Sequence, residues 1–443
     1  MYKLSKKSQG AKLWIRAQKT IAGGNMLLTK HPYRFLKEYW PTYFNKTKGC
    51  KVWDLNQNKF LDFSYMGVGT NSLGYSRKEI DQEVVKKIKL GNMSTLNSPE
   101  EVLLSEQLIN LNPWADKVRF TRSGGEANSV AVRIARSYKK KDKILICGYH
   151  GWHDWYLSTN LQSKNNLNGN ILAGLDPNGV PKALRNTTFA FKYNDIDQFN
   201  DLINKYDGEI AAVKMEVVRN IYPTNNFIQK VRSITKKKRI VLIFDECTSG
   251  FREAYGGIYK KYNVIPDMII YGKALGNGYA INAVLGKGKI MNSIESTFIS
   301  STFWTERIGY VAGLSTLKIM KKEKSWKKIT HNGNKIRKIW SKVFKKCNFN
   351  YQIQGIPALS NFYFEDQNNQ KFINFICEEM LKKGFLANNV FYACTAHNDA
   401  YINKYAKAFE ETCLLLKNNI ELNMFNSEIK KTTFINKRIG RLN

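Results

Sequence analysis

The chain has 443 residues, of which 43% are hydrophobic and 24% are charged, and this composition excludes both a disordered chain and one minimal domain. Its 70 lysine and arginine residues against 36 aspartate and glutamate residues give a formal net charge of +34. A surplus of this size is found in proteins that bind nucleic acid or an anionic membrane surface.

The distribution of the positive charge favours a different interpretation. Basic runs at residues 139–141, 236–239 and 321–322 fall near the ends of predicted helices, where the helix dipole favours cations. We therefore expect a solvated basic surface with no nucleic-acid or membrane partner. Nucleic-acid binding and a preference for anionic substrates remain open as alternatives.

The seven cysteines are scattered and form no CxxC pair. This pattern fits the reduced thiols of a cytoplasmic protein better than a disulfide scaffold or a zinc site. The basic N-terminal segment has no apolar region of the kind that signal peptides carry, and no run of about 18 apolar residues predicts a membrane-spanning helix. We expect a cytoplasmic protein.

Short apolar runs predict β-strands at residues 118–121, 144–148, 211–218, 240–245 and 268–271. Between the first two runs, residues 126–140 predict a helix with Ala127, Val130, Ala131 and Ile134 on one face. Alternation of strands and helices predicts an α/β fold with a mostly parallel sheet. Ligands of such sheets bind at the carboxyl ends of the strands, so we examine the residues that follow each strand.

The pattern changes near residue 307, where a long helical stretch runs to about residue 328 and a mixture of short strands and helices follows. We expect a large domain over residues 61–306 and a smaller α+β domain over residues 307–443. The N-terminal segment 1–60 is expected to join the smaller domain.

A serine and two glycines, Ser123, Gly124 and Gly125, lie between the first strand and the helix. Free N–H groups and a hydroxyl at a helix N-terminus can bind an anion. The structural alternative is an ordinary serine N-cap with Glu126 three residues later, and the two interpretations are equally well supported. A Walker sequence is absent, so the turn is not a nucleotide P-loop.

The second strand is followed by aromatic residues and two histidines, in the sequence GYHGWHDW. Tyr149 suits a planar ligand. His150 and His153 could bind a metal, but the chain has only five histidines and no HExxH pattern, so we expect no metal site.

Charged residues also follow the last two strands. Asp245 and Glu246 close one apolar strand, where a carboxylate is costly unless it is paired. Asp245 either caps the next turn or faces a buried cation. Lys273 follows the other strand between glycines, where a lowered pKa would let its amine form a Schiff base. A lysine, an acid, an aromatic ring and an anion site are what pyridoxal 5′-phosphate (PLP) requires.

Several segments carry a resemblance to a known family: RFTRSGGEANSVAVRIAR, GYHGWHD, IVLIFDECTSGFR, PDMIIYGKALGNG and SSTFWTERIGYVAGLSTL. From about Gly23 onward the chain resembles the class III aminotransferases of PLP fold type I, and most of all the glutamate-1-semialdehyde 2,1-aminomutase-like proteins. The resemblance implies a seven-stranded, mostly parallel sheet flanked by helices. It also implies a homodimer with shared active sites.

The resemblance also implies residue roles. Lys273 would form the internal aldimine and move protons, and Asp245 would pair with the pyridinium nitrogen. Tyr149 would stack on the ring, while Ser123, Gly124 and Gly125 would hold the phosphate. Thr302 would reach the phosphate of the neighbouring subunit's cofactor.

Two further residues match the family less well. Glu216 and Asn220 lie where the family has Glu-Pro-Val and a nearby asparagine beside the cofactor, but this chain has no proline there and a spacing one residue shorter. For Arg252 we expect a structural ion pair with Glu246 or Glu253.

The departures from the family concern the segments that border the substrate. Gly276-Asn277-Gly278 replaces a triple glycine, Ser301–Arg307 replaces Gly-Thr-Leu-Ser-Gly-Asn-Pro, and Tyr65–Asn71 replaces Ser-Trp-Gly-Pro. The variants YHGWHDW and STFWTERIG resemble those of aminomutase-like proteins associated with surface carbohydrate biosynthesis.

We therefore expect an aminotransferase that uses a small-molecule amino donor and a keto or aldehyde acceptor, in surface carbohydrate biosynthesis. The alternatives are a glutamate-1-semialdehyde aminomutase of tetrapyrrole synthesis, another PLP reaction such as racemisation or decarboxylation, and a basic binding protein on a retired enzyme fold. Intact Lys273 and Asp245 argue against the last alternative.

Overall fold

The computed structural model describes residues 2–163, 165–168 and 174–421. The chain divides into two compact units. Unit 1 consists of residues up to 77 together with those from 327 to the end of the described chain, and unit 2 consists of residues 78–326.

Both unit boundaries fall later in the chain than the boundaries expected at residues 60 and 306. Phe63 and Met66 are buried in the hydrophobic core of unit 1. Helix α10 (Arg307–Glu323) packs against α3 (Lys78–Ile88) and α4 (Pro99–Leu111) of unit 2. The expected division at residue 306 is therefore wrong, because the helix that begins there completes unit 2.

The single helical stretch expected from residue 307 to about residue 328 is two helices. Lys324 adopts a left-handed conformation with φ of 48° and ends α10, and α11 (Ser325–Lys346) begins at the next residue. Left-handed lysine is uncommon, so the sequence pattern gives no sign of the break.

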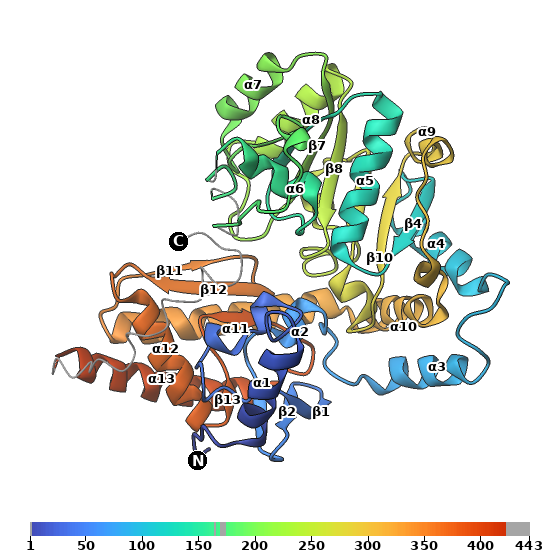
Figure 1. Cartoon of the computed structure of the whole chain (residues 1–443). Coiled ribbons are helices and arrows are strands. Elements are labelled where there is room, and N and C mark those ends of the chain that lie inside the picture. Colours follow the sequence, from blue (N-terminus) through green and yellow to red (C-terminus); the bar gives the residue numbers. More distant parts are fainter. Residues whose placement is uncertain (1, 164, 169–173, 422–443) are drawn as a thin grey trace. The chain divides into compact units, whose positions relative to one another are not determined.

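A seven-stranded sheet forms the centre of unit 2 (Figure 1). Its strands in spatial order are β4 (Lys117–Thr121), β10 (Asn282–Gly286), β9 (Met268–Tyr271), β8 (Val241–Glu246), β7 (Ile210–Glu216), β5 (Lys143–Cys147) and β6 (Thr188–Ala190). Strands β5 to β9 pair in parallel, and β10 is antiparallel to both of its neighbours. The predicted α/β fold with a mostly parallel sheet is confirmed, and so are all five predicted strands. β6 and β10 were not predicted.

Helix α5 (Gly124–Lys139) covers part of one face of this sheet (Figure 1). The four residues predicted for its apolar face, Ala127, Val130, Ala131 and Ile134, are all buried against sheet side chains. The other helices of unit 2 are α6 (Asp154–Leu157), α7 (Ile196–Lys205), α8 (Phe227–Lys237) and α9 (Gly288–Met291), with short 3₁₀ turns η3 (Ser158–Leu161), η4 (Lys182–Leu184), η5 (Ile258–Tyr262), η6 (Lys273–Gly276), η7 (Asn292–Ser296) and η8 (Thr302–Thr305).

Unit 1 has two smaller sheets. One contains β1 (Phe44–Lys48), β2 (Lys51–Asp54), β3 (Lys59–Asp62) and β13 (Phe385–Leu386), and the other contains β11 (Tyr351–Gln354), β12 (Leu359–Phe364) and β14 (Val390–Tyr392). Its helices are α1 (Gln9–Thr20), η1 (Leu28–Lys30), η2 (Pro32–Arg34), the irregular α2 (Met66–Gly69), most of α11, α12 (Asn369–Lys382) and α13 (Asp399–Glu421).

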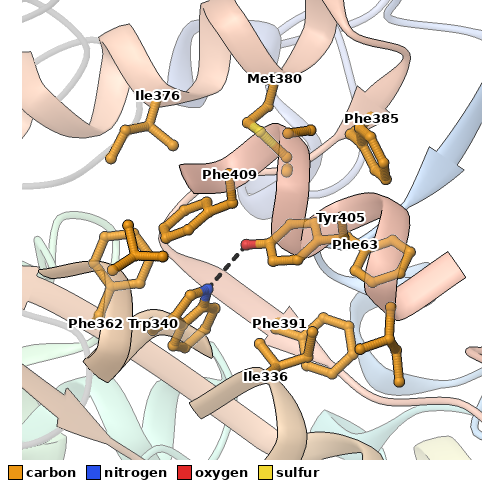
Figure 2. Close-up of a cluster of buried hydrophobic side chains, with 14 of the residues drawn as sticks. Phe63, Ile336, Trp340, Phe362, Ile376, Met380, Phe385, Phe391, Tyr405 and Phe409 are labelled. Carbon is orange, nitrogen blue, oxygen red and sulfur yellow. Dashed lines mark hydrogen bonds between the residues drawn. The ribbon is translucent and has the colours of Figure 1, made fainter. Parts of the chain in front are cut away.

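Aromatic side chains dominate the core of unit 1 (Figure 2). Trp340 is fully buried, and its indole N–H donates to the Tyr405 hydroxyl at 2.9 Å (Figure 2). The Tyr405 ring in turn stacks on Phe63, with ring centroids 4.7 Å apart. The buried polar atoms of this core thus have partners, as burial requires.

All seven cysteines are buried and free of disulfide bonds. No helix in the described ranges is long and apolar enough to cross a membrane.

Gly333 in α11 offers a test of how tightly unit 1 is packed. A Cβ atom at this position would lie 1.8 Å from the carbonyl oxygen of Pro357. Alanine favours a helix by about 1 kcal/mol over glycine, but overpacking a core costs about 1–3 kcal/mol and occasionally more. We therefore expect Gly333→Ala to lower the urea midpoint of unfolding, measured by circular dichroism. The matched control is Asn334→Ala, an exposed position on the same helix, and equal midpoints for the two variants would contradict the packing argument.

Candidate active site

The side chains predicted to carry chemistry gather at the carboxyl edge of the parallel strands in unit 2. Asp245 is the penultimate residue of β8, and in the register of the sheet it lies opposite Glu216, the last residue of β7. Lys273 comes two residues after β9, and Tyr149 comes two residues after β5. Four neighbouring strands thus end at the same edge of the sheet, and each brings one of these residues to it.

The Asp245 carboxylate is buried and has several partners. Its Oδ2 lies 2.8 Å from Nδ1 of His150 and 3.8 Å from Nζ of Lys214, and its Oδ1 accepts the N–H of Cys247 at 3.1 Å. Burial alone would raise the pKa of Asp245, but the Lys214 charge and the His150 hydrogen bond outweigh burial and hold the pKa below its usual value. Asp245 is therefore a buried anion. From the sequence, His150 had no assigned role in the site. In the structure its ring contacts Oδ2 of Asp245 and orients this carboxylate.

Lys273 is half-buried and begins the 3₁₀ turn η6 with φ of 42°. Non-glycine residues in this left-handed region are uncommon and cluster at functional sites. The Lys273 ammonium donates to Oγ1 of Thr248 at 2.5 Å. Burial, and next the charge of Arg219, lower the pKa of Lys273. A lowered pKa makes the neutral, nucleophilic amine available.

The turn before α5 contains a serine N-cap and also has N–H groups that can bind an anion, the two interpretations that its sequence left open. Ser123 is an N-cap whose Oγ accepts the N–H of Glu126 at 3.3 Å, and Glu126 accepts the N–H of Ser123 at 2.8 Å. The structural interpretation is therefore confirmed. The N–H groups of Gly124 and Gly125 lie in the first helical turn and have no partner within α5, so they can still bind an anion. A Cβ at Gly125 would lie 2.9 Å from Nε2 of His153, so only glycine leaves space there.

Tyr149 and Glu216 are joined directly. The N–H of Tyr149 donates to Oε2 of Glu216 at 3.0 Å, and Oε1 of Glu216 lies 3.4 Å from Nη1 of Arg219. Gly148 makes this contact possible, because a Cβ there would lie 2.7 Å from Oε2 of Glu216 and its φ is +111°. Asn220 lies half-buried in a bend beyond β7, and within the described ranges no hydrogen bond joins it to the other predicted site residues.

Thr302 is exposed at the start of η8. Its segment is tied to the turn before α5, since Nη2 of Arg122 donates to the carbonyl oxygen of Trp304 at 2.9 Å and Nε of Arg122 pairs with Glu306 at 3.3 Å. Among the described residues, no hydrogen bond joins the Thr302 side chain to Ser123, Gly124 or Gly125 of the same chain.

The Nε of Arg252 donates to the carbonyl oxygen of Thr248 at 3.2 Å. Glu246 accepts the N–H groups of Ile258 and Tyr259, and Glu253 pairs with Lys261. Among the described residues, no group of three or more histidine, cysteine, aspartate or glutamate side chains could hold a metal ion.

Sequence reasoning missed three members of this edge: Thr248, Lys214 and Arg219. A lysine inside the apolar run IAAVKMEVV is a detectable signal, because a strand buried on both faces is normally continuous in apolar residues. Nothing in the sequence distinguishes Thr248 from an ordinary loop threonine.

The set of donors fits PLP. Lys273 offers an amine of lowered pKa for an aldehyde, Asp245 offers a buried anion for a protonated ring nitrogen, and the first turn of α5 offers N–H groups for a phosphate. Each of these groups is buried or preorganised as such a cofactor requires.

Comparison with known proteins agrees with this geometry. The model of the family described as aminotransferase class-III matches residues 37–401. A glutamate-1-semialdehyde 2,1-aminomutase from Methanobrevibacter smithii is 30% identical over 422 residues, covering 90% of this chain and 96% of that protein. A 3-aminobutyryl-CoA aminotransferase from Cloacimonas acidaminovorans is 27% identical, covering 93% and 98%.

Solved structures show the same fold. FumI from Sphingopyxis sp. MTA144, in its PLP internal aldimine form, superposes with a TM-score of 0.84 at 23% identity and covers 93% of this chain and 97% of that chain. A glutamate-1-semialdehyde aminomutase from Pseudomonas aeruginosa gives a TM-score of 0.77 at 17% identity, covering 92% and 94%. The predicted PLP fold type I is confirmed, and the chain belongs to the class III aminotransferase family of PLP-dependent enzymes.

Proposed function

We propose that this enzyme is an aminotransferase that moves an amino group from an amino-acid donor to a keto or aldehyde acceptor of carbohydrate origin, in surface carbohydrate biosynthesis. The observation that carries the aminotransferase assignment is that neighbouring strands bring the buried anion Asp245 and the half-buried amine of Lys273 to one edge of the sheet.

In this proposal Lys273 holds the aldehyde of PLP, and Asp245 faces the ring nitrogen. Ser123, Gly124 and Gly125 hold the phosphate, Tyr149 lies against the ring, and Glu216 and Asn220 line the same edge. When bound, PLP withdraws electrons from the substrate carbon that carries the amino group.

The other steps fall to side chains of this chain. The Nζ atom of Lys273 would take the proton from the substrate carbon and deliver it to the former aldehyde carbon of PLP, because its lowered pKa keeps a fraction of the amine neutral. Arg219, whose charge acts on Lys273, is suited to hold the carboxylate of an amino-acid donor.

The carbohydrate acceptor is supported by the replacement of three segments that border the substrate in the aminomutases. The structure reduces the number of replaced residues that support a carbohydrate acceptor. Trp304 donates from its indole N–H to Oε1 of Glu126, and Glu306 caps α10 by accepting the N–H groups of Ile308 and Gly309. Both side chains therefore have structural roles. Asn277 is buried and lies four residues after Lys273, and this position beside the candidate site supports the proposal.

The second candidate function is glutamate-1-semialdehyde 2,1-aminomutase. It is favoured by two relatives that carry this name, from Methanobrevibacter smithii and Methanococcoides burtonii, which are 30% and 28% identical to this chain. The two candidates share all of the cofactor residues and differ in the acceptor.

A substrate test separates the two candidates. We expect glutamate to convert the bound cofactor to its amine form, followed in the visible spectrum, while glutamate-1-semialdehyde is a poor acceptor for that form. The measurement is 5-aminolevulinate production by the amine form after addition of the semialdehyde. Turnover of about 1 per second or faster, ordinary for an enzyme with its natural substrate, would replace our proposal with the aminomutase.

A second prediction concerns Lys273. Lys273→Ala should lose the covalent link to PLP and nearly all turnover, because Lys273 follows β9 at the edge where ligands of such sheets bind, whereas the other amine near Asp245, that of Lys214, is enclosed in the interior of the sheet. Borohydride reduction of the wild-type enzyme followed by peptide mapping should find PLP on Lys273. Attachment to another lysine would show that the assignment is wrong. Lys287→Ala, which removes a lysine that pairs with Asp267, is the control for loss of a charged side chain.

A third prediction concerns assembly. Phe298 and Phe303 are 82% and 68% exposed on the segment around Thr302, and exposed aromatic side chains of this size mark interfaces. We propose a homodimer in which Thr302 reaches the phosphate bound by the partner subunit. Thr302→Ala should retain less PLP on gel filtration than Ser300→Ala, an exposed hydroxyl two residues earlier. A monomer by light scattering that keeps full activity would contradict the shared site.

A further inference from the structure

Lys214 is a charged residue in the interior of the sheet. It lies on β7 between Ile146 of β5 and Ile243 of β8, and it is 0% exposed. Among the residues that the structure describes, its Nζ has no hydrogen-bond partner. An isolated ammonium in such surroundings is costly, so its position requires a compensating anion.

The anion is Asp245, whose Oδ2 lies 3.8 Å from Nζ of Lys214. The two residues are diagonal neighbours on the same face of the sheet, since Lys214 is opposite Ile243 and Asp245 is two residues further along β8. Lys214 approaches the carboxylate from the interior of the sheet, below the strand end that carries Asp245.

The inference rests on the function proposed above, in which Asp245 also receives the ring nitrogen of PLP. We propose that Lys214 is a positioning residue that neutralises Asp245 from the core side and competes with the ring nitrogen of the cofactor for the charge of that carboxylate. Asp245 then attracts the protonated ring nitrogen less strongly than an aspartate with no second cation beside it would.

The groups around Lys214 agree with a competition of this kind. Burial lowers the pKa of the Lys214 amine, while Asp245, Cys247 and Glu216 act in the opposite direction. His150, from the loop after β5, also faces Asp245, at 2.8 Å. The protonated ring nitrogen of bound PLP would offset part of the Asp245 charge and so remove part of what keeps Lys214 protonated.

The test is Lys214→Met, which keeps the length of the side chain and removes its charge. Wild-type and variant holoenzymes are stripped of PLP, and the affinity for added PLP is measured from about pH 6 to about pH 9, on either side of neutrality. We expect the variant to bind PLP about tenfold more tightly at neutral pH, the equivalent of about one pKa unit. The difference should shrink as the pH rises, because Lys214 loses its proton.

The matched control is Met215→Leu, a volume-conserving change at the next residue of β7, which is fully buried and points to the opposite face. It should leave the affinity and its pH dependence unchanged. Equal or weaker PLP binding by Lys214→Met, with the pH dependence of the wild type, would overturn the inference.

A second measurement does not depend on folding of the variant. An analogue of PLP with carbon in place of the ring nitrogen carries no ring charge, so Lys214 can continue to compensate Asp245 when the analogue binds. The wild type should therefore bind the analogue and PLP with affinities within about tenfold, less than the full cost of an unsatisfied buried charge. A preference for PLP above about a hundredfold would mean that Asp245 has no other effective cation, and the inference would be wrong.

Asp245→Asn separates failure of the inference from failure of the proposed function. If Asp245→Asn weakens PLP binding and Lys214→Met does not strengthen it, the ring-nitrogen role of Asp245 stands and the competition does not. If neither variant changes PLP binding, Asp245 does not receive the ring nitrogen and the proposed function fails at that residue.

Discussion

A carboxylate at the end of a buried strand has to be compensated, and the strand ends of unit 2 are arranged around the carboxylate of Asp245. Transfer of an unpaired ion into a protein interior costs several kcal/mol even after relaxation. Here the compensation comes from three directions: His150 after β5, Lys214 within β7 and the N–H of Cys247 after β8. These contacts join side chains of three neighbouring strands and their loops at the edge where ligands of α/β sheets bind.

The second element of this edge is the junction of Tyr149 and Glu216. It depends on the absence of a side chain at Gly148, and it brings the loop after β5 onto the end of β7. Arg219 then lies close enough to affect both Glu216 and Lys273. The edge is therefore one connected network of charges, and a substitution at any member changes the electrostatic surroundings of the others.

Much of this arrangement could be predicted from the sequence, because strand ends with unusual residues are visible in it. Lys273 and Asp245 were identified since each interrupts an apolar run, and the apolar face of α5 followed from its spacing. β6 and β10 were missed because neither contains more than three consecutive apolar residues. Apolar runs this short are weak evidence for a strand. The division into units was misplaced because α10 looks like the start of a new region although it packs on α3 and α4.

Lys214 and Trp304 show where sequence reasoning stops. The strand containing Lys214 was predicted, but the partner of its charge lies on another strand and depends on register. The segment Ser301–Arg307 was expected to border the substrate, whereas the indole N–H of its Trp304 donates to Glu126 at the N-terminus of α5. Both cases depend on contacts between residues far apart in the chain, which composition and spacing do not specify.

The burial of all seven cysteines has a chemical consequence for an enzyme whose substrates carry carbonyl groups. Aldehydes are electrophiles, and the nucleophile that they meet in a thiol is the thiolate. Burial raises the pKa of every cysteine in the chain, that of Cys50 to about 12. The cysteine side chains are thus poor nucleophiles toward reactive carbonyl compounds, whereas the lowered pKa of Lys273 favours its nucleophilic, neutral amine.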